Sequence, residues 1–130
     1  MKKIASAACA CLAAVVLAMA VGCSNSALAD AYSYVVSGYS AASLCFEITS
    51  DGSCVTVDTN PYDLDDYLVS GSTTAIRSFH DRLGLPDYIW TEMSQTRYLD
   101  GRQTEMVNGY VISWTYHPDM GLEATYRYAN

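Results

Sequence analysis

Residues 44–58 alternate between apolar and polar side chains on both sides of Asp51-Gly52. The apolar positions are Phe46, Ile48, Val55 and Val57. A period of two is the pattern of a strand with one buried face, and Asp-Gly is a strong signal for a tight type I′ turn. The segment therefore predicts a β-hairpin in which Thr49 lies opposite Cys54.

A second hairpin is predicted over residues 110–128. Two segments rich in β-branched and aromatic side chains flank a Pro-Asp-Met-Gly sequence that starts at Pro118. Proline and glycine suit the first and last positions of a four-residue turn, and this turn places Trp114 opposite Thr125. The face that packs on the helices is then formed by Tyr110, Ile112, Trp114 and Tyr116.

Between the two hairpins the apolar residues follow helical spacing. The stripe of the first predicted helix consists of Ile76, Phe79 and Leu83. Ser72 or Thr73 can cap the start of this helix, and Gly84 ends it. A second helix begins at Pro86, which suits a first helical turn, and continues to about Tyr98.

These elements predict an α+β fold in the order ββ-αα-ββ. Its two hairpins form a small antiparallel sheet, and its two helices pack on one face of that sheet. The length of 130 residues allows one domain, which we place at residues 34–130. Residues 34–39 are predicted to be a further strand.

Residues 1–22 differ from the rest of the chain. Lys2 and Lys3 precede a mainly apolar run from Ile4 to Val21, which is typical of a secretory signal peptide. Ala20-Val21-Gly22-Cys23 resembles the lipobox of bacterial lipoproteins. The resemblance implies that Cys23 becomes the lipidated N-terminus and attaches the protein to the membrane, with residues 23–33 as a flexible tether.

A second cleavage site competes with the first. Ala27-Leu28-Ala29 has the A-x-A pattern of ordinary secretion, with cleavage before Asp30. The protein is extracytoplasmic in both cases: anchored by its lipid to the cell membrane or envelope in the first, and secreted in the second.

The net charge of the mature chain restricts the classes of molecule that it can bind. From Cys23 onward there are fourteen Asp and Glu against five Arg and no Lys, a net charge of −9. Such a chain repels phosphate groups, so nucleic acid is excluded as a partner.

Cys45 and Cys54 leave two alternatives open. In a regular hairpin Cys45 lies opposite Asp58, about 13 Å along the strands from Cys54. A disulfide needs Cα atoms within about 7 Å. Either the hairpin is regular and both thiols are free, or the loop is irregular and a disulfide forms, as an oxidising compartment favours.

No motif for catalysis stands out. The sequence contains no G-x-S-x-G elbow and no Gly-rich phosphate loop, and His80 and His117 lack a third zinc ligand. The acidic residues of 58–66 lack the glycine and closing glutamate of an EF-hand. We therefore expect no catalytic residue, no metal and no cofactor.

Residues 73–128 resemble the small modules of the SmpA/OmlA and beta-lactamase-inhibitor-like proteins. The matching residues are Leu83-Gly84-Leu85-Pro86-Asp87 between the helices and Trp114-Thr115-Tyr116 in a strand. Those families are small envelope lipoproteins or secreted inhibitors that work by binding proteins, so the resemblance implies a binding role.

Aromatic residues are the candidates for a contact surface. Tyr88 and Trp90 lie on the second predicted helix, and Tyr126 and Tyr128 lie on the outward face of the second hairpin. We expect a non-enzymatic module that uses these residues to bind a protein or a cell-wall component. The alternatives are a small extracytoplasmic hydrolase that uses carboxylates and a purely structural envelope protein.

Overall fold

The fold comes from a computed structural model that describes residues 26–65 and 67–130. The predicted signal peptide and Cys23 lie outside the described residues. No helix among the described residues has the length and apolar character that crossing a membrane requires.

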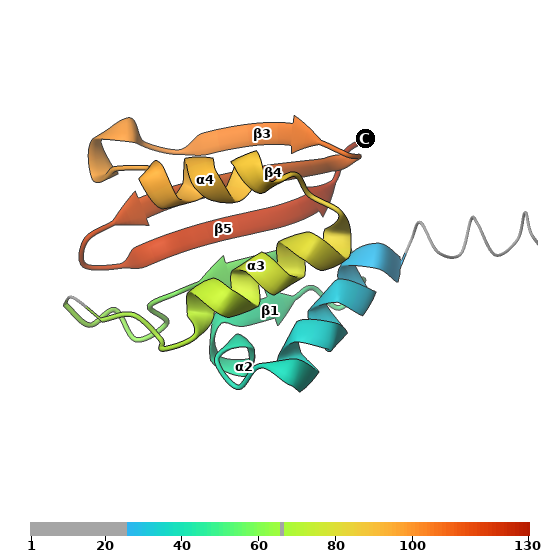
Figure 1. The fold of residues 1–130 in the computed structure, drawn as a ribbon, viewed down its shortest axis with the longest axis horizontal. Coiled ribbons are helices and arrows are strands. Elements are labelled where there is room, and N and C mark those ends of the chain that lie inside the picture. Colours follow the sequence, from blue (N-terminus) through green and yellow to red (C-terminus); the bar gives the residue numbers. More distant parts are fainter. Residues whose placement is uncertain (1–25, 66) are drawn as a thin grey trace, which may run out of the picture.

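A single antiparallel sheet of five strands forms the centre of the described fold (Figure 1). In chain order its strands are β1 (Phe46–Ile48), β2 (Cys54–Asp58), β3 (Gln103–Val107), β4 (Tyr110–His117) and β5 (Gly121–Tyr128). In space the order is β1-β2-β5-β4-β3. The last strand in the chain therefore lies in the middle of the sheet and joins β2 to β4.

Helices cover one face of this sheet (Figure 1). They are the helical residues 26–38, which we call the N-terminal helix, together with α2 (Ala42–Cys45), α3 (Ser72–Leu83) and α4 (Asp87–Gln95). A short 3₁₀ turn, η1 (Tyr98–Asp100), leads into β3. The opposite face, which we call the outer face, carries no helix of the described chain.

The core lies between the helices and the inner face of the sheet. The predicted stripe of Ile76, Phe79 and Leu83 is buried, as amphipathic spacing requires. The Phe79 ring packs edge-on against Phe46 at 5.4 Å and against Tyr126 at 4.9 Å between ring centroids. One aromatic side chain of α3 therefore ties β1 to β5.

The predicted fold class is wrong in its order and in its two separate hairpins. The missed strand is β3, which pairs with β4 through a turn at Asn108-Gly109. Both turn residues have positive φ, as a type I′ hairpin requires, and Asn-Gly is its usual sequence. With β3 included and β5 paired with β2, five strands form one sheet.

The N-terminal region also differs from the prediction. Residues 26–33, expected as tether, and 34–38, expected as strand, are helical. Leu28, Ala31 and Val35 recur at three- and four-residue spacing and are buried in the core.

The registers of the two hairpins had different outcomes. In the first, Phe46 pairs with Val57, which is the predicted register. In the second, Trp114 pairs with Ala124 instead of Thr125, because Gly121 is already the first residue of β5 and the loop is one residue shorter. A slip of one residue moves every side chain of a strand to the other face.

Candidate binding groove

Tyr126 is not part of a surface, which corrects its predicted role. It pairs with Ile112 and shares the inner face with it, so its side chain is fully buried. Its hydroxyl lies 2.7 Å from Nε2 of His80 and donates to Sδ of Met93 at 3.9 Å. Burial lowers the pKa of His80 to about 4 and raises that of Tyr126, so both groups stay neutral.

The other predicted surface residues do not meet on one surface either. Tyr128 is half-buried, and its hydroxyl accepts a hydrogen bond from the backbone N–H of Leu28 at 3.1 Å. The Tyr88 hydroxyl is exposed and donates to Oε1 of Glu105 at 3.2 Å. Trp90 is half-buried and lines a groove at the end of the sheet where β4 turns into β5.

We call this hollow the end groove; its volume is about 580 Å³. Its bottom is apolar and is formed by the buried side chains of Ile76, Met93 and Leu122. Three aromatic residues from three different segments surround this bottom: Tyr67, Trp90 and Tyr116. One end is polar and consists of Ser94, Gln95, Thr96 and Arg97.

Side-chain hydrogen bonds of Thr59 and Asn60 hold the loop that contains Tyr67 against the sheet. The hydroxyl of Thr59 accepts from the N–H of Leu122 at 2.9 Å. The Asn60 amide donates to the carbonyls of Leu64 and Asp119, each at 2.8 Å. Both side chains are buried, so these bonds fix one wall of the groove relative to the turn between β4 and β5.

Gly121 makes this junction possible. Its φ of +77° is in the region that favours glycine, and an added Cβ would lie 2.6 Å from Oγ1 of Thr59. Any side chain at position 121 would push the loop away from the strand.

Large apolar side chains are exposed around the end groove. Its apolar rim consists of Tyr62, Leu64, Leu68 and Met120, which are 42–56% exposed. The first three lie on the loop between β2 and α3 and the fourth on the turn between β4 and β5, at the same end of the molecule (Figure 1). An apolar patch of this kind on a small domain marks a contact surface.

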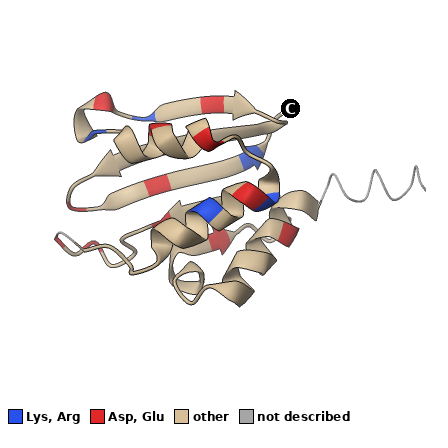
Figure 2. Cartoon of the chain, viewed as in Figure 1, with Lys and Arg blue, Asp and Glu red and all other residues tan. Residues whose placement is uncertain are grey.

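The charge around the groove is mainly negative, as Figure 2 shows for the loop and the turn. Its acidic rim consists of the exposed residues Asp63, Asp65 and Asp119, on the loop and the turn beside the groove. The nearby cation, Arg97, is paired with Asp100 at 3.2 Å, and the Arg97 N–H and guanidinium hold the pKa of Asp100 below its usual value.

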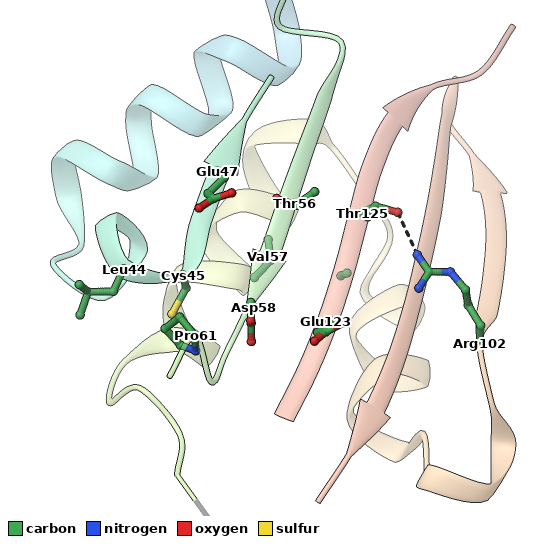
Figure 3. A pocket seen from close by; sticks show the side chains of 11 residues that line it. Leu44, Cys45, Glu47, Thr56, Val57, Asp58, Pro61, Arg102, Glu123 and Thr125 are labelled. Atoms are coloured by element: carbon green, nitrogen blue, oxygen red, sulfur yellow. Dashed lines mark hydrogen bonds between the residues drawn. The ribbon is translucent and has the colours of Figure 1, made fainter. Parts of the chain in front are cut away.

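A second hollow, of about 380 Å³, lies on the outer face (Figure 3). Glu47, Asp58 and Glu123 line it, and Arg102 reaches across β4 to donate to the hydroxyl of Thr125 at 3.5 Å. Asp58 stands directly opposite Glu123. Its pKa is raised by burial and by nearby Asp63 and Glu47, against the lowering effect of the hydrogen bond from the Asn60 N–H.

The Cys45 side chain also lines the second hollow. Burial, and secondarily the charge of Asp58, raise the pKa of its thiol to about 11, so the thiol is protonated and weakly nucleophilic. Cys45 and Cys54 are both free thiols, in keeping with the regular hairpin. No three His, Cys, Asp or Glu side chains of the described chain come together as metal ligands.

Comparison of the chain with protein-family models, with curated proteins and with solved structures finds no match. The lipobox and the resemblance of residues 73–128 to small envelope modules stay predictions.

Among the aromatic residues of the groove, only Trp90 is a predicted contact residue. The pattern of residues 63–68 predicts an acidic turn or a short helical segment. The signal that was available is the interleaving of Tyr62, Leu64, Tyr67 and Leu68 with the acidic residues, since an ordinary solvated loop has few large apolar side chains.

Proposed function

We propose that this chain is an exported, lipid-anchored protein of the bacterial envelope that binds a partner protein without catalysis. The observation that carries the binding role is the end groove with its apolar rim. The groove has an apolar bottom, aromatic sides and a wall held by buried hydrogen bonds, so little ordering is needed when a partner binds.

The packing of Leu28 supports lipidation at Cys23 over cleavage before Asp30. Leu28 is fully buried, and its N–H donates to the hydroxyl of Tyr128. Cleavage before Asp30 would remove this side chain from the core, whereas cleavage before Cys23 keeps it.

The position of the end groove suits an anchored binding protein. Cys23 is three positions before Ser26 in the sequence, a span of at most about 10 Å. Leu28 lies beside Tyr128 at one end of β5, and the groove lies at the other end, about 24 Å away over eight residues. A lipid on Cys23 would therefore leave the groove facing away from the membrane.

Labelling with a radioactive fatty acid tests the anchor. The Cys23→Ser variant is expected to lose the label and leave the membrane fraction, while Cys54→Ser, the control, keeps both. A label that persists in Cys23→Ser, or a mature N-terminus at Asp30, would contradict lipidation.

Photo-crosslinking in intact cells tests whether a partner protein binds at the groove. A crosslinking residue at position 68, on the apolar rim, is expected to capture a discrete partner. The same residue at position 106, which is 71% exposed on the outer face, is the control and should capture none. Equal capture at the two positions, or none at 68, would contradict binding through the groove.

A further inference from the structure

We propose that the end groove takes a cationic segment of the partner protein, with one or two large apolar side chains inserted in the groove and Lys or Arg placed over the acidic rim. This inference rests on the proposed function, because it assumes that the groove is the binding surface. It adds the chemistry of the partner.

The shape of the groove requires an apolar anchor. Its volume of about 580 Å³ is within the range of pockets that bury a ligand. Ile76 and Met93 are almost fully buried below it, and Trp90 and Tyr116 offer ring surface beside it. A leucine or aromatic side chain would remove this surface from water, which is the main source of binding energy at such contacts.

The carboxylates around the groove favour positively charged residues on both sides of the apolar anchor in the partner segment. Among the described residues Asp63 and Asp65 have no arginine partner, and Asp119 lies beside the His117 ring, 4.0 Å from it. The charge of Arg97 is neutralised by Asp100. A segment with two or three Lys or Arg would meet uncompensated carboxylates on two sides of its apolar anchor.

The same charges argue against other occupants. A second copy of the proposed mature chain, from Cys23 onward, would bring a net charge of −9 and no lysine to an acidic rim. An anionic lipid surface would be repelled for the same reason. A cationic protein segment is the occupant for which both the apolar surface and the charge are complementary.

Selection from a library of random nine-residue peptides tests the proposal. The target is the full-length chain in detergent micelles, and the negative target is the double variant Tyr67→Ser, Leu68→Ser. Met106→Ser, which removes an exposed apolar side chain outside the groove, is the matched control. Peptides retained by the wild type and by Met106→Ser are expected to be net positive and to contain Leu, Phe or Trp.

The charge is then tested on one selected peptide. Its affinity should fall about three- to tenfold in the Asp63→Asn, Asp65→Asn variant at 50 mM NaCl, and much less at 500 mM, because salt screens the attraction. Glu47→Gln removes an exposed carboxylate from the other face of the sheet and should change nothing.

The outcomes separate this inference from the proposed function. Neutral or acidic peptides that need Tyr67 and Leu68, or an affinity unchanged in Asp63→Asn, Asp65→Asn, would overturn the cationic partner and leave the groove as a binding site. Equal retention of peptides by the wild type and the Tyr67→Ser, Leu68→Ser variant would overturn both.

Discussion

Tyr126 contacts side chains of two helices, and no local pattern in the sequence indicates these contacts. Its ring packs edge-on against Phe79 and 5.5 Å from the ring of His80. Its hydroxyl is the hydrogen-bond partner of a histidine that is 4% exposed and whose Nδ1 has no partner. This side chain joins β5 to both α3 and α4.

We expect Tyr126→Phe to lower the free energy of unfolding by about 1–3 kcal/mol. The ring volume stays, but a buried nitrogen of His80 loses its partner. Tyr88→Phe removes an exposed hydroxyl bonded to the half-buried Glu105 and should cost less than about 0.5 kcal/mol. Urea denaturation of both variants measures the difference, and equal losses would show that the His80 contact contributes nothing.

His80 makes stability depend on pH. Its pKa falls from 6.5 to about 4 on folding because burial disfavours the charged ring. The unfolded chain therefore binds a proton that the folded chain does not, so stability is complete above about pH 6.5 and falls as the pH decreases toward 4. We expect a loss of about 2 kcal/mol from this group between pH 7 and pH 5.

Urea denaturation at pH 7 and pH 5, repeated with His80→Gln, isolates the contribution of His80 to stability. The free energy of unfolding should fall less between the two pH values in the variant than in the wild type. The NMR titration of His80 in the wild type gives a second measurement that needs no variant. A midpoint near 6.5 in the folded protein would contradict the argument.

We expect the two thiols of the domain, Cys45 and Cys54, to be free. Alkylation in denaturant without reductant should modify both Cys45 and Cys54. In the folded protein Cys54, which is half-buried, should react faster than Cys45, which is buried and has a raised pKa. A mass unchanged by alkylation would reveal a disulfide and a different loop.

At the scale of elements, the N-terminal helix is part of the domain. We expect Leu28→Ala to lower the free energy of unfolding by about 2–5 kcal/mol, as for other buried leucines. Leu44→Ala is the matched control, because Leu44 in α2 is 50% exposed and should cost far less. Equal effects in thermal denaturation would mean that this helix does not pack as described.

Local signals predicted the elements that depend on local physics. The stripe of α3 and its end at Gly84, with φ of +68°, follow from spacing and backbone freedom. The alternation on both sides of Asp51-Gly52 predicted the register of the first hairpin correctly, but the type I′ turn is wrong, because Gly52 has a positive φ and Asp51 does not. In the second hairpin one residue of loop length decided which face Tyr126 occupies, and both lengths suit Pro118 and Gly121.

The features that the sequence did not predict depend on contacts between segments that are far apart in the chain. Leu28 becomes a core residue only because Tyr128, a hundred positions away, lies beside it. The end groove combines Tyr67, Trp90 and Tyr116 from a loop, a helix and a strand, so no window of the sequence contains it. Of these three residues only Trp90 was predicted to lie on a contact surface.

At the scale of the molecule, we expect the proposed lipid anchor and the groove to lie at opposite ends. In the lipidated protein on vesicles, with Cys54 replaced by serine, a fluorophore on Met120→Cys should be quenched less by nickel-chelating lipids than one on Ser33→Cys. Met120 lies on the turn beside the groove and Ser33 on the N-terminal helix. Stronger quenching at position 120 would mean that the groove faces the membrane.

The order of the strands also determines when the sheet can form during synthesis of the chain. β5 is the last strand in chain order, yet it is hydrogen-bonded to both β2 and β4, so the β1-β2 pair has no place in the sheet until residues 121–128 have been made. Contacts between such distant segments form slowly. A nascent chain therefore cannot complete its sheet until residues 121–128 have been made. For the export that we propose, this delay would keep the chain unfolded while it passes through a translocation channel.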